Sequence, residues 1–177
     1  MSRKYIYLVL VSLFAGFAAY KNWQSEAPAI ESGSKYIKID KENRESFNIL
    51  IVGDTGTGND NQFSVAKAMD NYCKNNELDF VIMLGDNFYQ AGVRSITDLQ
   101  WQTKWQDVYL TNCLKTKKFY PILGNHDYKF TPGVQIEYSK IDNNWTMPAR
   151  FYKMELEDTA DIIAMDTNIN EDRKSVV

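Results

Sequence analysis

Three glycine-containing loops, each placed directly after a short apolar run, are the feature that most constrains the fold of this chain. The apolar runs cover residues 47–52, 79–84 and 118–123, and the loops cover 53–56, 85–89 and 124–127. Short apolar runs that end in turn residues are typical of buried strands in a parallel sheet. Pro121 in the third run indicates an edge strand or a strand end, because proline cannot donate to a sheet ladder.

Helical patterns separate these runs. Apolar residues at helical spacing predict a helix over 62–75. Thr97 and Gln100 fit a capping box ahead of a second amphipathic helix, whose aromatic residues we assign to the core: Trp101, Trp105 and Tyr109. Two further strands are expected at 150–156 and 160–165, around a turn. The alternation of strands and helices predicts a largely parallel α/β sheet.

Each of the three loops places a hard oxygen donor directly after its glycine: Asp54, Asp86 and Asn125. Ligands of open α/β sheets bind beyond the carboxyl ends of the strands, so we expect these donors to converge. With the phenol of Tyr89 they form a set that suits small, hard cations. Taken alone, Gly53-Asp54 is typical of an ordinary turn. The repetition at three strand ends in one order favours a site.

The order Gly-Asp-x-Gly, Gly-Asp-x-x-Tyr, Gly-Asn-His-Asp resembles that of the calcineurin-like metallophosphoesterases. Tyr89 narrows the resemblance to the purple acid phosphatases, specifically the small tartrate-resistant type. Further similarity lies at 119–128, 138–139, 145–152 and 164–167, so that it covers about residues 47–168. The resemblance implies an α/β fold, a β-sandwich flanked by helices (α/β/β/α), with only its N-terminal part present here.

The resemblance also implies a dinuclear metal centre, a ferric ion beside a divalent iron, zinc or manganese ion. Asp54 and Tyr89 would hold the ferric ion, and Asp86 would bridge both metals. Asn125 would hold the divalent ion. The implied activity is the acid hydrolysis of phosphomonoesters by a metal-activated water.

Two catalytic residues are implied outside the metal ligands. His126 would bind the substrate phosphate or protonate the leaving group, and Asp127 would orient it. The family completes its metal sites with a Val-x-x-His histidine and a Gly-His-x-His pair, whereas the 177 residues contain one histidine. We therefore expect this chain to be inactive alone and to self-associate through an exposed sheet face. The alternative is a non-catalytic secreted or membrane-anchored binding protein of the same fold.

The N-terminal region indicates delivery to the secretory pathway. Residues 1–20 combine two cations with an uncharged apolar run at 5–20, which is the pattern of a signal peptide or a signal anchor. Residues 21–46 read as a polar linker, and 47–177 as the N-terminal part of the phosphoesterase domain. The destinations are secretion, a lysosome-like compartment or membrane attachment through 5–20. The net charge of −3 without a basic block argues against a nucleic-acid partner.

Two further features depend on that compartment. Asn144-Trp145-Thr146 is a glycosylation sequon, to be weighed equally against a chance match. Cys73 and Cys113 could pair in an oxidising compartment. We expect two buried thiols instead, because Cys73 lies on the apolar face of a predicted helix.

Overall fold

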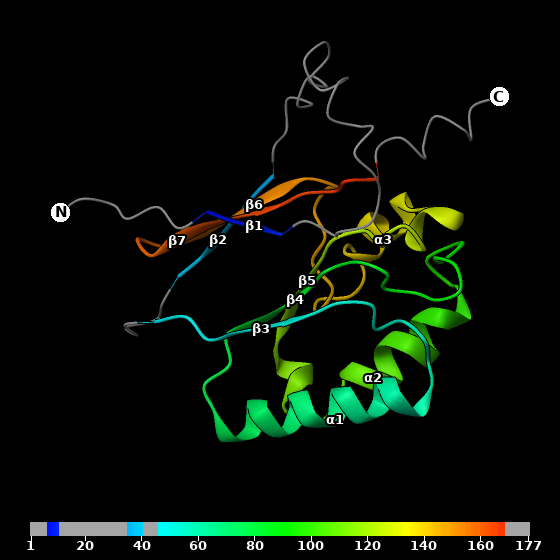
Figure 1. Ribbon diagram of the computed structural model, residues 1–177, viewed down its shortest axis with the longest axis horizontal. Coiled ribbons are helices and arrows are strands. Elements are labelled where there is room, and N and C mark those ends of the chain that lie inside the picture. Colours follow the sequence, from blue (N-terminus) through cyan, green and yellow to red (C-terminus); the bar gives the residue numbers. More distant parts are fainter. Residues whose placement is uncertain (1–6, 11–34, 41–45, 169–177) are drawn as a thin grey trace, which may run out of the picture.

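The computed structural model describes residues 7–10, 35–40 and 46–168, which form two β-sheets and a layer of helices (Figure 1). The first sheet is parallel and has the order β3-β4-β5. Its strands are β3 (Ile49–Val52), β4 (Phe80–Met83) and β5 (Lys118–Pro121). The second sheet is mixed and has the order β1-β7-β6-β2. Its strands are β1 (Tyr7–Leu10), β2 (Lys35–Ile39), β6 (Tyr152–Leu156) and β7 (Ala160–Ala164).

These elements stack in three layers. Figure 1 shows α1 and α2 on one side of the parallel sheet and the mixed sheet on its other side. Side chains of both sheets and of the helices belong to one hydrophobic core. The hydroxyl of Tyr152 on β6 also donates to the carbonyl of Pro121 on β5, at 2.8 Å. The predicted mixed α/β class is confirmed.

The parallel sheet forms from the three apolar runs. All four residues of β4 are buried, because this strand is central and covered on both faces. That explains why its sequence shows no polar alternation. β5 lies at the sheet edge and Pro121 is its last residue, as the proline indicates. β3 ends at the predicted residue, whereas β4 ends one residue and β5 two residues before the predicted boundary.

The helices differ more from the prediction. α1 (Asp60–Asn75) begins two residues earlier than expected, because the side chain of Asn59 accepts from Asn61 N and Gln62 N as a cap. The second helix is a π-helix, η1 (Trp101–Gln106), continued by α2 (Asp107–Tyr109). The remaining helical elements are η2 (Leu114–Thr116), η3 (Asp127–Lys129) and α3 (Gly133–Tyr138).

The capping box predicted at Thr97 is wrong. Thr97 Oγ1 contacts Ser95 Oγ at 3.1 Å, and no side chain caps η1 at Gln100. Asp98 supplies the acceptor instead, since its Oδ1 accepts from Gln100 N at 3.0 Å and its Oδ2 from Arg94 N at 2.8 Å. Asp98, the residue after Thr97, therefore accepts the hydrogen bond from Gln100 N that the predicted capping box assigned to Thr97.

The aromatic residues of η1 and α2 belong to the core, as predicted. Trp101, Trp105 and Tyr109 are each at most 3% exposed. Trp101 stacks on Tyr138 of α3 with ring centroids 3.5 Å apart. Trp105 meets Phe119 of β5 edge to face at 4.8 Å. These contacts fix the helical layer on the parallel sheet.

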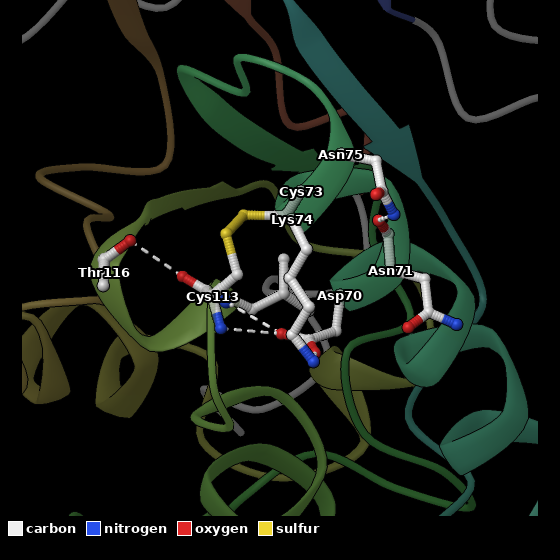
Figure 2. A network of polar contacts seen from close by, with 8 residues as sticks. Asp70, Asn71, Cys73, Lys74, Asn75, Cys113 and Thr116 are labelled. Carbon is white, nitrogen blue, oxygen red and sulfur yellow. Dashed lines mark hydrogen bonds and ion pairs between the residues drawn. A yellow bond between two sulfur atoms is a disulfide. The ribbon is translucent and has the colours of Figure 1, made fainter.

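Cys73 and Cys113 form a disulfide, so the expectation of two thiols is wrong (Figure 2). Cys73 lies on the buried face of α1, and the turn before η2 brings the Cα of Cys113 to 5.9 Å from that of Cys73. That separation is within the range of disulfides. Helical periodicity reports the face on which Cys73 lies, but not which distant segment packs there.

The N-terminal predictions fall mostly outside the described residues. Tyr7–Leu10, within the apolar run, is strand β1 and pairs with β7. Lys35–Ile39, within the predicted linker, is strand β2 and pairs with β6. In the described part of the chain, no helix is long and apolar enough to cross a membrane.

Candidate metal centre

The three glycine loops meet at one edge of the parallel sheet. They follow β3, β4 and β5, and parallel strands place their carboxyl ends on the same side. Backbone hydrogen bonds join the first loop to the second. Asp54 N donates to Gly85 O at 3.1 Å, Gly56 N to Asp86 O at 3.3 Å, and Tyr89 N to Gly56 O at 2.7 Å.

The turns rest on aspartates as well as glycines. Asp54 and Asp86 have φ of 56° and 52°, in the left-handed region, and Gly85 has φ of 96°. Aspartate tolerates that region better than most residues, and such conformations cluster at functional sites. Gly124 is required for another reason: a Cβ there would lie 2.2 Å from both the backbone nitrogen and Oδ1 of Asp86. The missing side chain lets the third loop pack against the second.

The hydroxyl of Tyr89 lies between two carboxylates. It is 2.8 Å from Asp54 Oδ1 and 2.7 Å from Asp86 Oδ2. Burial and then the hydrogen bonds to both aspartates raise the pKa of this phenol above its ordinary value. The single hydroxyl proton of Tyr89 is shared between the two carboxylates. Three hard oxygen atoms therefore converge with one proton between them. This donor set fits a cation.

Asn125 lies on the adjoining loop, between two residues that contact Asp86. Gly124 packs against Asp86, and His126 N donates to Asp86 Oδ1 at 2.9 Å. The side chain of Asn125 is exposed. Among the described residues, no group of three or more His, Cys, Asp or Glu side chains could hold a metal ion. The candidate ligands comprise two carboxylates, a phenol and an amide.

The ring of His126 lies beside that of Tyr89, with centroids 4.4 Å apart. Its Nδ1 is 2.8 Å from the carbonyl oxygen of Gln90. The Nζ of Lys129 is 2.8 Å from the same Nδ1 and 3.2 Å from the same carbonyl oxygen. The imidazole and the ammonium therefore share one acceptor at the rim of the site.

Asp127 is buried beneath the loops. Its Oδ2 accepts from Gly124 N at 2.8 Å and Asn87 N at 3.1 Å, and its Oδ1 accepts from Gln135 Nε2 at 2.8 Å. Burial raises the pKa of this carboxyl to about 7, against the opposing effect of these hydrogen bonds. The carboxylate thus contacts two loops and α3, whereas the His126 ring contacts Gln90.

Sequence reasoning missed five residues that position the site: Asn87, Gln90, Lys104, Lys129 and Gln135. Lys104 Nζ donates to the carbonyl of Tyr89, and burial lowers the pKa of this lysine. Asn87 lies within a glycine loop and Lys129 lies two residues after one, so proximity to these loops in the sequence could have identified both residues. Lys104 and Gln135 reach the site from helices, and nothing local in the sequence marks them.

Known proteins resemble this chain in sequence and in fold. Residues 47–172 match the family described as calcineurin-like phosphoesterase. Tartrate-resistant acid phosphatase type 5 of Homo sapiens is 41% identical over 76 residues, which cover 43% of this chain and 23% of that protein. The Oryctolagus cuniculus protein of the same name is 33% identical over 111 residues, covering 59% and 34%. Purple acid phosphatase 7 of Arabidopsis thaliana is 30% identical over 131 residues, covering 73% and 40%.

The matched part of this chain thus spans between 23% and 40% of the length of these relatives. Among solved structures, GAP50, described as the anchor in the inner membrane complex of Plasmodium, is similar with a TM-score of 0.55 and 25% identity. The similarity covers 66% of this chain and 39% of that one.

Proposed function

This chain belongs to the calcineurin-like phosphoesterase family, and we propose on that basis that it supplies part of an acid phosphatase site, which hydrolyses phosphomonoesters at a dinuclear metal centre. Its matched relatives include tartrate-resistant and purple acid phosphatases. The observation that carries the proposal is the convergence of Asp54 Oδ1 and Asp86 Oδ2 on the Tyr89 hydroxyl, at 2.8 and 2.7 Å.

In this proposal Asp54 and Tyr89 would hold a ferric ion, Asn125 would hold a divalent iron, zinc or manganese ion, and Asp86 would be shared by both. The three converging oxygens support the first assignment, and the position of Asn125 between Gly124 and His126 supports the second. When bound, such a metal pair polarises phosphoryl oxygens and lowers the pKa of a water.

The chain's own residues bind and orient the substrate. His126 is the proposed phosphate-binding residue or acid for the leaving oxygen. Its Nδ1 lies against the Gln90 carbonyl, which restrains the ring and leaves Nε2 as the nitrogen for substrate. Asp127 acts in this proposal as a positioning residue. It accepts hydrogen bonds from Gly124 N and Asn87 N, next to the ligands on both loops.

The single histidine sets the expected activity of these 177 residues. The family resemblance implies three further histidine ligands, and losing even one residue that supports a metal ligand typically costs 10- to 100-fold in affinity or activity. We propose that this chain alone binds metal incompletely. Its turnover then falls below the range of about 1 to 10³ s⁻¹ that is usual for enzymes.

Ferric titration of the purified chain tests the centre. A visible absorption band is expected from the Tyr89 phenolate, and Tyr89→Phe should abolish it. Tyr72→Phe is the matched control, since Tyr72 is a 43% exposed tyrosine on α1. Absence of a Tyr89-dependent band would overturn the ferric assignment.

Hydrolysis of an aryl phosphate by the same metal-loaded samples tests the activity. We expect a trace rate above the metal-free background, lost in Asp86→Asn. Two metals per chain together with an enzyme-like rate would overturn the proposal that this chain is inactive alone. A rate equal to background, unaffected by Asp86→Asn, would agree with a chain that is inactive alone, and the ferric titration then decides whether the centre exists.

The second candidate function is a non-catalytic binding or anchoring role. The similarity to GAP50, the anchor in the inner membrane complex of Plasmodium, favours it. In this proposal the apolar run at residues 5–20 stays uncleaved and attaches the chain to a membrane, which requires β1 (Tyr7–Leu10) to give up its pairing with β7. Alkaline extraction of membranes from cells that express the chain separates the two cases: an anchored chain stays in the membrane pellet, and a cleaved, secreted chain appears in the medium.

A further inference from the structure

Lys129 occupies an unusual position for a surface lysine. It ends η3, two residues beyond the buried Asp127, and its side chain is exposed. Its Nζ lies 2.8 Å from Nδ1 and 3.3 Å from Nε2 of His126. The third contact is the Gln90 carbonyl, at 3.2 Å.

These contacts leave the ammonium with spare capacity to donate. Lys129 has three N–H donors, and the Gln90 oxygen that it contacts is also the partner of His126 Nδ1. Within residues 7–10, 35–40 and 46–168, no ion pair joins Lys129 to a carboxylate. The cation is therefore held in place but not neutralised.

The carboxylates near Lys129 explain how its ammonium affects the binding of an anion. Asp54 and Asp86 meet at the Tyr89 hydroxyl, and the Tyr89 ring lies 4.4 Å from the His126 ring. In the metal-free chain these two carboxylates repel an approaching phosphate. An ammonium held beside His126 offsets that repulsion, and it does so more strongly for a dianion than for a monoanion.

We propose that Lys129 and His126 form an oxyanion-binding pair, and that Lys129 makes the site prefer dianionic phosphomonoesters over monoanionic phosphodiesters. This inference rests on the proposed function, because it assigns the substrate class of the same site. Lys129 acts as a specificity-determining residue: its ammonium donates to a non-bridging phosphate oxygen while His126 contacts the same group.

The single histidine of the chain allows a test without metal or turnover. The ring Cε1–H resonance of His126 is followed by NMR in the chelator-treated chain at constant pH, while inorganic phosphate is added. We expect a saturable shift. Lys129→Gln should weaken the apparent phosphate affinity about tenfold, which is the scale of one charge-assisted hydrogen bond. Lys129→Arg should retain most of the affinity.

Two comparisons make the test specific. Lys115→Gln removes the same charge from an exposed lysine on η2 and should leave the phosphate affinity unchanged. Dimethyl phosphate, a monoanion, should bind the unaltered chain more weakly than phosphate does, and Lys129→Gln should narrow that difference. Equal losses in the two lysine variants, or no shift of the His126 resonance, would overturn the proposal.

Failure of this inference is distinguishable from failure of the proposed function. A phosphate-induced His126 shift without a Tyr89-dependent ferric band would refute the metal centre and leave the oxyanion pair in place. The reverse result would refute the pair and leave the metal centre in place.

Discussion

The hydroxyl of Tyr128 donates a hydrogen bond to the buried carboxylate of Asp166, which joins the His126 loop to the segment that follows β7. Asp166 is 1% exposed, and its other oxygen accepts from Asn168 N at 2.9 Å. The guanidinium of Arg150 lies 5.4 Å from the centre of the Tyr128 ring. Tyr128 therefore connects the edge that carries the candidate site to the mixed sheet.

Tyr128→Phe should destabilise the chain by about 1 to 3 kcal/mol, because it takes a donor from a buried carboxylate. Urea unfolding of the variant measures the loss. Tyr72→Phe, at an exposed tyrosine of α1, should change stability by less than about 0.5 kcal/mol. Equal stability of the two variants would contradict the structural role of the Tyr128 contact.

Reduction of the Cys73–Cys113 disulfide should also destabilise the fold. The bond closes a loop with a sequence separation of 40 residues. Loop-closure entropy then gives a loss of about 4 kcal/mol at most. Unfolding curves of the oxidised chain and of the Cys73→Ala, Cys113→Ala double variant provide the comparison, with a free-thiol assay to establish the oxidised state. Two titratable thiols in the native oxidised chain would contradict the bond.

Asp70 predicts a pH dependence. Burial raises the pKa of this carboxyl, but hydrogen bonds from Lys74, Leu114 N and Cys113 N outweigh burial and lower it below 3.8 (Figure 2). A lowered folded-state pKa stabilises the fold above the unfolded value, and the contribution is lost as pH falls through the folded value. Asp70→Asn should therefore cost about 1 to 2 kcal/mol at pH 7. In unfolding measurements, that cost should shrink progressively below about pH 4; a constant difference would oppose this explanation.

A pair of glycine variants tests the packing of the third loop. Gly124→Ala would place a Cβ 2.2 Å from Asp86 N and Oδ1, so either the loop or Asp86 must shift. We expect loss of more than about 2 kcal/mol of stability or loss of ferric binding. Gly133→Ala, where nothing lies within 4 Å of an added Cβ, should be neutral or stabilise α3 by up to about 1 kcal/mol.

Delivery gives a separate prediction at Asn144. In cells with a secretory pathway we expect the chain to enter it and Asn144 to carry glycan. The Nδ2 of Asn144 donates to the carbonyls of Lys115 and Lys117, at 2.8 and 2.7 Å. A glycan on Nδ2 leaves one N–H, so one of these hydrogen bonds would be lost. Glycosidase treatment should increase gel mobility, and Asn144→Gln should remove the change. A cytosolic chain with no mobility change would refute both readings.

The sequence predicted the parts that depend on strand order. Buried runs ending in glycine loops place their donors at one edge whenever the strands are parallel, and Asp54 and Asp86 do meet at Tyr89. Most of the missed parts are non-local. The disulfide depends on which turn packs against α1, and the contacts of His126 and Lys129 with Gln90 depend on a carbonyl from a different loop.

Local signals also failed where two of them competed. Thr97 and Gln100 have capping-box spacing, yet Asp98 accepts from Gln100 N and Arg94 N. The role expected for Asp127 illustrates a different limit. A residue adjacent to His126 in sequence was expected to orient its ring, but a completely buried carboxylate takes its partners from the surrounding backbone and from Gln135.

The connectivity of the parallel sheet has a consequence for folding. Its three strands follow one another in the sequence. Residues 144–146 then pair with β5: Phe119 N donates to Asn144 O at 2.7 Å, and Thr146 N donates to Phe119 O at 2.8 Å. All six candidate residues lie between β3 and residue 146, a segment that contains no strand of the mixed sheet. Segments of this kind open and close as cooperative units. Amide hydrogens of β4 should therefore exchange with solvent more slowly than those of β6 and β7. Brief opening of the mixed sheet should leave the candidate site assembled.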